Sequence, residues 1–144
     1  MTLYLDTSSL VKLYVEEAGS HSVRDLVEAS TVVATSSIAY AEARAALARR
    51  RRELTLGAAA LVSARKALEA DWPRYFTVEV TSALCREAGE FAERYRLRAY
   101  DSVHLAAFAE LVRGAGAHDT RFSSFDAALN RAARSLLRTL RRSR

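Results

Sequence analysis

Short apolar segments alternate with longer helical segments along the chain, and this alternation restricts the fold more than any other feature. Four apolar segments have the length and composition of buried strands, namely residues 2–6, 31–35, 75–79 and 121–125. Helical periodicity predicts helices over residues 8–16, 20–29, 37–51, 54–70, 81–95, 99–113 and 126–137. Strands that alternate with helices form a mainly parallel sheet covered by helices on both faces. The sequence therefore predicts an α/β fold.

Length and composition are those of a single globular domain. The 144 residues can bury a core, and half of them are apolar. No apolar run reaches the roughly 18–20 residues of a membrane-spanning helix, and the first residues lack the pattern of a signal peptide. We therefore expect a cytoplasmic protein without a membrane partner. Cys85 is the only cysteine, which excludes an intrachain disulfide and a thiolate zinc site, and its helical setting predicts a buried thiol.

The net charge of +5 comes from one end of the chain. Residues 131–144 carry six arginines and no acid, whereas the rest of the chain holds 16 basic and 17 acidic residues. A second basic run, Arg49–Arg52, lies near the tip of a hairpin formed by the helices predicted over 37–51 and 54–70. Guanidinium groups bind phosphate well, so these arginines favour a polyanionic partner. The alternative is a solvated helix face with a frayed end, and we expect residues 138–144 to form a basic tail.

Four acidic residues stand among apolar or small residues instead of on a solvated face. Asp6 follows the first strand, and an acid at the end of a buried strand has few structural reasons to be there. Glu42 shares a helix face with Ile38 and Ala41, which predicts that its carboxylate points inward. The alternative for Glu42 is an ordinary surface position with an ion pair to Arg49.

Asp101 and Asp126 both stand near the start of a predicted helix. Asp101 projects on the same side as Leu105 and Phe108, and Asp126 directly follows the last strand. An aspartate at either position could instead cap the helix by accepting hydrogen bonds from backbone N–H groups. The two roles are compatible, because a capping carboxylate is presented at the mouth of the helix.

Acids that converge in this way need a cation. Carboxylates a few ångströms apart repel one another unless a positive charge neutralises them, and ligation by oxygen alone selects Mg²⁺ or Mn²⁺ over zinc. Such ions activate water and stabilise the charge on a phosphoryl group. The candidate catalytic and metal-binding residues are Asp6, Glu42, Asp101 and Asp126. Three hydroxyl groups are placed to orient ligands or water, those of Thr7, Ser36 and above all Ser8.

The histidines do not form a metal-binding set. His21, His104 and His118 have no paired spacing, and His104, one helical turn after Asp101, is expected to make a structural hydrogen bond. The sequence has neither a glycine-rich phosphate loop nor a Gly-x-Ser-x-Gly elbow. Nucleoside triphosphate chemistry and serine hydrolysis are therefore poorly supported.

Taken together, the acidic motifs resemble those of the PIN-domain family, and the likeness extends over almost the whole chain. The matching motifs are Asp6-Thr7-Ser8-Ser9-Leu10, Ala39-Tyr40-Ala41-Glu42, Tyr100-Asp101-Ser102-Val103-His104 and Ser124-Phe125-Asp126-Ala127. Within that family, the chain resembles a VapC-type ribonuclease toxin of a bacterial type II toxin–antitoxin system. The arginine-rich C-terminus is a departure for which the resemblance supplies no role.

The resemblance implies a PIN-like three-layer α/β/α sandwich with a short, mainly parallel central sheet, which would occupy residues 1–137. It also implies an endoribonuclease that depends on Mg²⁺ or Mn²⁺, with Asp6, Glu42 and Asp101 as its invariant acids. The fourth, more variable acid maps to Asp126, with Asp119 as the alternative. The implied partners are an RNA substrate, a small VapB-type antitoxin in a hetero-oligomer, and a second copy of the chain in a homodimer.

The sequence thus predicts hydrolysis of RNA phosphodiester bonds by the four acids, with Ser8 in a supporting role. Arg49, Arg50, Arg51 and Arg52 are predicted to contact the RNA, and the terminal arginines to steer it at long range. One alternative is a non-catalytic PIN-like module that binds nucleic acid or protein, although such a module would be expected to have lost an acid. Another is a phosphatase, but the Asp-x-Asp pair of one large phosphatase class is absent here.

Overall fold

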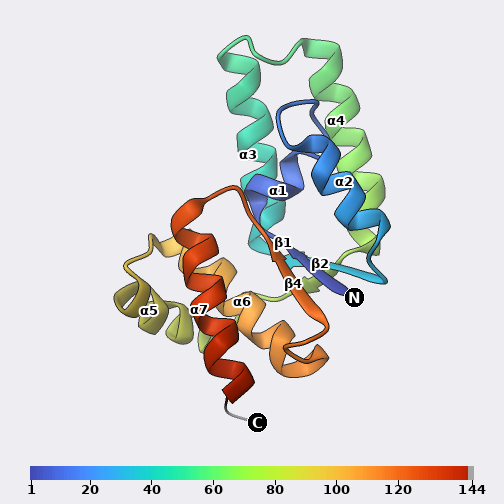
Figure 1. Ribbon diagram of the computed structural model, residues 1–144. Helices are drawn as coiled ribbons and strands as arrows, with labels where there is room; N and C mark the ends of the chain where they lie inside the picture. Colours follow the sequence, from blue (N-terminus) through green and yellow to red (C-terminus); the bar gives the residue numbers. More distant parts are fainter. Residues whose placement is uncertain (143–144) are drawn as a thin grey trace.

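A computed structural model describes residues 1–142 and shows a four-stranded, entirely parallel sheet (Figure 1). The strands are β1 (Thr2–Leu5), β2 (Val32–Ser36), β3 (Phe76–Val78) and β4 (Thr120–Ser123), in the order β3-β2-β1-β4. β1 is central, and its Tyr4 is level with Ala34 of β2 and Phe122 of β4. The four predicted strands are confirmed, and every bound lies within two residues of its expected position.

Helices cover both faces of this sheet. They are α1 (Thr7–Val11), α2 (Ser20–Glu28), α3 (Ile38–Arg52), α4 (Ala58–Asp71), the 3₁₀ turn η1 (Trp72–Arg74), α5 (Ser82–Tyr95), α6 (Ala99–Ala115) and α7 (Ala127–Arg142). α1 ends five residues early, because the N–H groups of Lys12, Leu13 and Tyr14 bond to carbonyls three residues back instead of four. α7 continues to Arg142, so residues 138–142 of the expected tail are helical. Residues 143–144 lie outside the described part, and the division into a domain and a tail stays a prediction.

Side chains of β1 alternate between two cores, one on each face of the sheet. Tyr4 packs with Phe108 and Leu129 against the layer of α5, α6 and α7. Leu3 and Leu5 pack against α1 to α4 on the opposite face. All five side chains are fully buried, and the alternation follows from the two-residue repeat of a strand. The two helical layers and the sheet between them form the expected three-layer α/β/α sandwich (Figure 1).

α3 and α4 form an antiparallel hairpin that projects from the rest of the protein (Figure 1). The run Arg49–Arg52 occupies the last turn of α3, near the tip of the hairpin, as predicted. This position holds the arginines away from both cores.

The buried faces of α5 and α6 pack against each other. α5 contributes Leu84, Ala88 and Phe91 to this contact, which leaves the neighbouring Cys85 exposed. The prediction of a buried thiol is therefore wrong, because Cys85 lies beside the buried face of α5 and not on it. α6 is the most apolar of the long helices, yet neither it nor any other helix within residues 1–142 is long and apolar enough to cross a membrane.

Candidate active site

Asp6 lies where β1 ends and α1 begins, and only 4% of it is exposed. Its Oδ1 accepts hydrogen bonds from the Ser8 hydroxyl at 2.7 Å and from the Ser9 backbone N–H at 3.0 Å. Its Oδ2 accepts one from the Ser124 hydroxyl at 2.6 Å, and Ser8 in turn accepts the Phe125 N–H at 3.0 Å. The bond from Ser9 makes Asp6 the N-cap of α1. The expectation that Asp6 has few structural reasons for its place is therefore wrong.

The environment of Asp6 disfavours its charged form. Burial raises the pKa of Asp6, because the carboxylate loses its hydration. Hydrogen bonds from Ser124, Ser8 and the Ser9 backbone lower the pKa again, but they do not cancel the effect of burial. A cation beside Asp6 would therefore stabilise this part of the protein.

The loop between β4 and α7 brings Asp126 to the edge of the sheet where Asp6 lies. Ser124 connects the two acids, because its hydroxyl donates to Asp6 and accepts the Asp126 backbone N–H at 3.0 Å. Asp126 Oδ1 accepts the Leu129 N–H at 2.8 Å, which confirms that Asp126 caps α7.

Asp119, the alternative fourth acid, lies at the opposite edge of the sheet. It precedes β4, is exposed, and pairs with the N-terminal ammonium group at 3.4 Å. Ligands of parallel sheets bind at the carboxyl ends of the strands, and Asp6 and Asp126 follow two such ends. Of the two alternatives, only Asp126 therefore lies on the edge occupied by Asp6.

Glu42 points inward from α3, as predicted, and it does not contact Arg49. Its Oε1 accepts hydrogen bonds from the Thr7 hydroxyl at 2.8 Å and from His104 Nε2 at 2.7 Å. Its second oxygen, Oε2, makes no hydrogen bond within residues 1–142. Thr7 directly follows Asp6 in the sequence. The hydrogen bond from Thr7 therefore holds Glu42 against the first residue of α1.

His104 is buried on α6 and links Glu42 to Tyr4 of β1. Its Nδ1 lies 2.8 Å from the fully buried Tyr4 hydroxyl. An ionised carboxylate can only accept, so Nε2 donates its N–H to Glu42, and Nδ1 is left to pair with the Tyr4 hydroxyl. Burial raises the pKa of Tyr4 well above its usual value, which keeps its hydroxyl protonated. The structural hydrogen bond predicted for His104 is confirmed, whereas its partner Tyr4 was missed.

The pKa values of Glu42 and Asp6 are shifted in opposite directions from their usual values. Burial alone would raise the pKa of Glu42, but the hydrogen bond and charge of His104, with the bond from Thr7, lower it below its usual value. No comparable donor outweighs burial at Asp6. The site therefore favours the ionised form of Glu42 and disfavours that of Asp6.

Asp101 lies in the first turn of α6, one turn before His104. The N-cap of α6 is Arg98, so the capping alternative for Asp101 is wrong. Instead, the Asp101 carboxylate lies 3.3 Å from the Arg98 guanidinium, with 21% of its side chain exposed. Within residues 1–142 it shares no hydrogen-bonding partner with the other three acids.

The hydroxyl residues divide into those that contact the acids and one that does not. Ser8 and Thr7 each donate to an acid, whereas within residues 1–142 the Ser36 hydroxyl accepts only the Ile38 N–H, at 3.4 Å, where α3 begins. Ser124, which bridges two acids, was missed because the sequence assigns it to the last strand. Two serines within three residues of an acid that opens a helix were the available signal.

The oxygen atoms of these acids and hydroxyls are the kind of ligand that a hard cation prefers, but they are not arranged as a complete metal site. Carboxylates and hydroxyls supply the oxygen ligands that Mg²⁺ and Mn²⁺ prefer. Within residues 1–142, however, no three His, Cys, Asp or Glu side chains are grouped so that they could hold a metal ion. The structure links Asp6 to Asp126 through Ser124, places Glu42 beside the next residue of α1, and leaves Asp101 in a separate ion pair.

The arginine run at the end of α3 is partly neutralised. Arg49 pairs with Glu53 at 2.9 Å, and Arg50 binds both oxygens of Glu17 at 3.0 and 3.1 Å. The other two arginines of the run make no ion pair within residues 1–142. The run begins seven residues after Glu42, which is about 10 Å along the helix axis.

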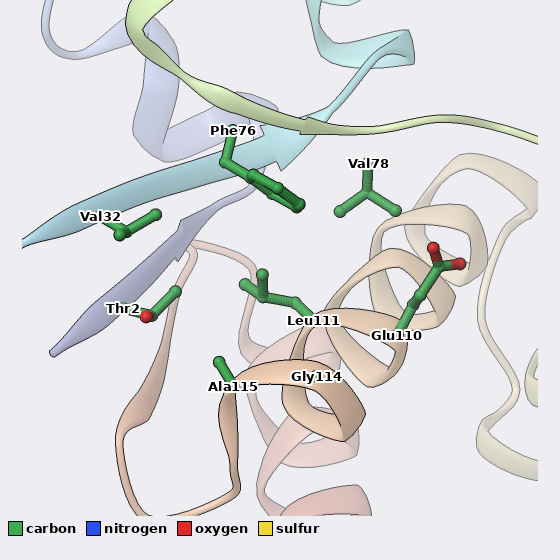
Figure 2. Close-up of a pocket in the computed structure, with 8 residues that line it drawn as sticks. All are labelled: Thr2, Val32, Phe76, Val78, Glu110, Leu111, Gly114 and Ala115. Atoms are coloured by element: carbon green, nitrogen blue, oxygen red, sulfur yellow. The ribbon is translucent and has the colours of Figure 1, made fainter.

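An apolar hollow of about 490 Å³ lies at the other edge of the sheet (Figure 2). Thr2 and Val32, at the starts of β1 and β2, line it together with Phe76 and Leu111. Glu110 is the one ionisable group among its lining residues. The hollow is therefore separate from the candidate active site.

Replacing Ser124 with alanine is expected to destabilise the protein by about 1.5–3 kcal/mol at pH 7, because Asp6 loses a donor while it is charged. The pKa of Asp6 rises further in this variant, so the loss should shrink as the pH falls and Asp6 becomes protonated. Urea unfolding at pH 7 and pH 4 measures both effects. Ser123→Ala is the control, because it removes an uncharged bond to Ser9 and should cost the same at each pH. An equal loss for Ser124→Ala at both pH values would contradict the prediction.

Comparison with known proteins gives consistent results. Residues 3–135 match the family model described as PIN domain. The chain is 36% identical over 104 residues to Ribonuclease VapC45 of Mycobacterium tuberculosis strain CDC 1551 and to Ribonuclease VapC49 of strain H37Rv. These matches cover 72% of the chain and 72% of each relative.

A solved structure shows the same fold. The crystal structure of Mycobacterium tuberculosis VapC20, described as a sarcin-ricin loop cleaving toxin, superposes with a TM-score of 0.66 and 24% sequence identity. The superposition covers 90% of this chain and 94% of VapC20. The chain therefore belongs to the PIN-domain family and, within it, to the VapC ribonucleases.

Proposed function

We propose that the chain is an endoribonuclease that hydrolyses RNA phosphodiester bonds and depends on Mg²⁺ or Mn²⁺. The observation that carries this proposal is Asp6, a buried carboxylate at the carboxyl edge of the sheet whose pKa burial has raised. Asp126 and Glu42 are held next to it through Ser124 and Thr7. A divalent cation at this edge would offset the cost of keeping negative charge out of water.

In this proposal Asp6, Glu42 and Asp101 would hold the ion, and Asp126 would complete its shell or bind a second one. When bound, the ion supplies an activated water and stabilises the charge that develops on the phosphoryl group. Asp101 would have to exchange its contact with the exposed Arg98 for this role.

The protein's own contribution is orientation of the carboxylates. The hydroxyls of Ser8 and Ser124 bond one to each oxygen of Asp6 and fix its plane. Thr7 and His104 hold Oε1 of Glu42 and leave Oε2 available to a ligand. Such fixed carboxylates need no reorganisation when substrate binds.

The test is incubation of the purified protein with total cellular RNA. We expect discrete fragments in Mg²⁺ or Mn²⁺, a loss of at least about a hundredfold in rate with EDTA, and recovery when excess metal is added. Cleavage that continues in EDTA would refute metal dependence. Absence of cleavage under every condition would favour the non-catalytic module. Mapping the cut sites would identify the class of RNA.

We also propose a cellular location, an assembly state and partners for the enzyme. It acts in the cytoplasm as the toxin of a toxin–antitoxin pair, forms a homodimer, and is neutralised by a small VapB-type protein. Arg49–Arg52 contact the RNA, mainly through the two arginines that make no ion pair within residues 1–142. Light scattering of the chain alone and with the antitoxin would give the two assembly states.

A further inference from the structure

α7 carries a stripe of arginines along one face. The stripe consists of Arg131, Arg134, Arg138, Arg141 and Arg142, all of them exposed. At 3.6 residues per turn, these positions fall within an arc of about 100° on the helix. The opposite face buries Leu129, Ala132, Ala133 and Leu136 against the core. The stripe therefore faces outward along nearly the whole helix.

The positive charge of this stripe is not compensated by the protein. Seven other arginines pair with carboxylates, namely Arg24, Arg44, Arg49, Arg50, Arg74, Arg98 and Arg113. Within residues 1–142, none of the stripe arginines does so, and residues 127–142 contain no acid. Arg141 makes a hydrogen bond to the Ala117 carbonyl at 3.2 Å, which leaves its charge unpaired.

Helix stability does not explain the stripe. Cations are favoured near the last turn of a helix, where they interact with its dipole, so this accounts for Arg141 and Arg142. Arg131 and Arg134 lie in the first half of α7 and gain nothing from that interaction. Uncompensated cations that do not serve the helix are available to an external polyanion.

The position of α7 connects the stripe to the candidate active site. The helix starts at its cap Asp126, beside Asp6, and runs away from that edge along the outside of the protein (Figure 1). The stripe begins five residues after Asp126 and extends for about 17 Å, the length of about five phosphates along one strand of a duplex.

We propose that the arginine stripe of α7 binds the sugar–phosphate backbone of the RNA substrate where it leaves the active site. This inference rests on the proposed ribonuclease function and adds the surface that holds the substrate. The run on α3 is less suited to this task, because Glu53 and Glu17 already neutralise half of its charge. Contacts to phosphates carry no sequence information, so the stripe would set affinity and direction rather than the cut site.

The test uses the triple variant R131Q/R134Q/R138Q, combined with Asp6→Asn so that binding is measured without cleavage. Glutamine keeps the length and helix propensity of arginine at exposed positions. Fluorescence anisotropy with a labelled 20-nucleotide RNA of mixed sequence should show binding about 10- to 100-fold weaker at 0.1 M salt. The slope of log K against log salt should fall by about 2, the value for three lost contacts to a single strand.

A matched control removes the same charge elsewhere. The variant R65Q/K66Q/R86Q, with the same Asp6→Asn change, loses three exposed cations from α4 and α5. It should retain the affinity and nearly the full salt slope. Equal weakening by both triple variants would overturn the proposal, because net charge alone would then explain binding.

The outcomes also separate this proposal from the ribonuclease assignment. If the wild-type chain cleaves RNA but the stripe variant binds with an unchanged salt slope, the stripe proposal fails and the function stands. If RNA binding depends on the stripe but no cleavage occurs, the ribonuclease assignment is refuted and RNA binding by the stripe is supported. Stripe-dependent binding to vesicles of phosphatidylcholine and phosphatidylglycerol, with unchanged RNA binding, would overturn the proposal in favour of a membrane surface.

Discussion

Replacing Asp6 with asparagine is expected to lower the rate of RNA cleavage by about a thousandfold or more while the fold is retained. Asparagine keeps the shape and can still accept the N–H of Ser9, so α1 keeps its cap. It lacks the negative charge that a divalent cation requires. Cleavage of labelled RNA under saturating metal measures the effect. Retained cleavage would refute the role of Asp6.

The same variant should unfold a few degrees higher than the wild type when metal is absent. The folded-state pKa of Asp6 is raised, so its ionised form costs stability at neutral pH, and asparagine removes that cost. The cost disappears as the pH falls and Asp6 becomes protonated, so the two proteins should converge toward pH 4. Thermal unfolding in EDTA at pH 7 and pH 4 tests this. A variant that is less stable than the wild type at pH 7 would contradict it.

Asp119→Asn is the matched control for Asp6→Asn. Asp119 is exposed and pairs with the N-terminus at the other edge of the sheet. Its replacement should leave the rate of cleavage and the unfolding temperature nearly unchanged. A large loss of cleavage in Asp119→Asn would return Asp119 to the position of fourth acid in place of Asp126.

Replacing His104 with alanine is expected to destabilise the protein by about 3–4 kcal/mol and to lower the rate of cleavage by about 10- to 100-fold. The stability loss has two sources, a cavity beneath α6 and the buried Tyr4 hydroxyl, which loses the hydrogen-bond partner that lies 2.8 Å away. The rate falls because Glu42 loses the donor that orients Oε1. Urea unfolding and kinetics at a temperature where the variant is folded measure the two effects separately.

Tyr4→Phe shows whether this hydrogen-bonded chain acts as a unit. Alone, it should cost about 1 kcal/mol, because one hydrogen bond is lost and the ring stays in the core. Combined with His104→Ala, it should cost less than the sum of the two single changes, since no buried hydroxyl is then left without a partner. Strict additivity would mean that the bond between Tyr4 and His104 contributes nothing.

Local sequence signals were sufficient for the fold. The apolar segments predicted four strands because each is bounded by turn or cap residues, and the alternation with helices then required a parallel sheet. Small neighbours on α3 predicted the inward direction of Glu42, which its bonds to Thr7 and His104 confirm. The length of α7 was underestimated, because its last turn is rich in arginine and the apolar repeat fades there.

The hydrogen bonds of the candidate site could not be predicted, because they join residues far apart in the sequence. Tyr4 and His104 are separated by 100 positions, and each alone looks like an ordinary core residue. Ser124 and Asp6 are separated by 118 positions, and their contact depends on the exact end of β4. Register at that end decides which serine faces the acid, and a shift of one residue would exchange Ser123 for Ser124.

β1 lies at the centre of the sheet, between β2, which follows it closely in the sequence, and β4, which is made more than 100 residues later. A polypeptide that is still being made contains Asp6 before it contains β4 or Ser124, which donates a hydrogen bond to Asp6. Activity can therefore appear only once β4 and Ser124 have been translated. Fragments released early by premature termination should be harmless to the cell that makes them.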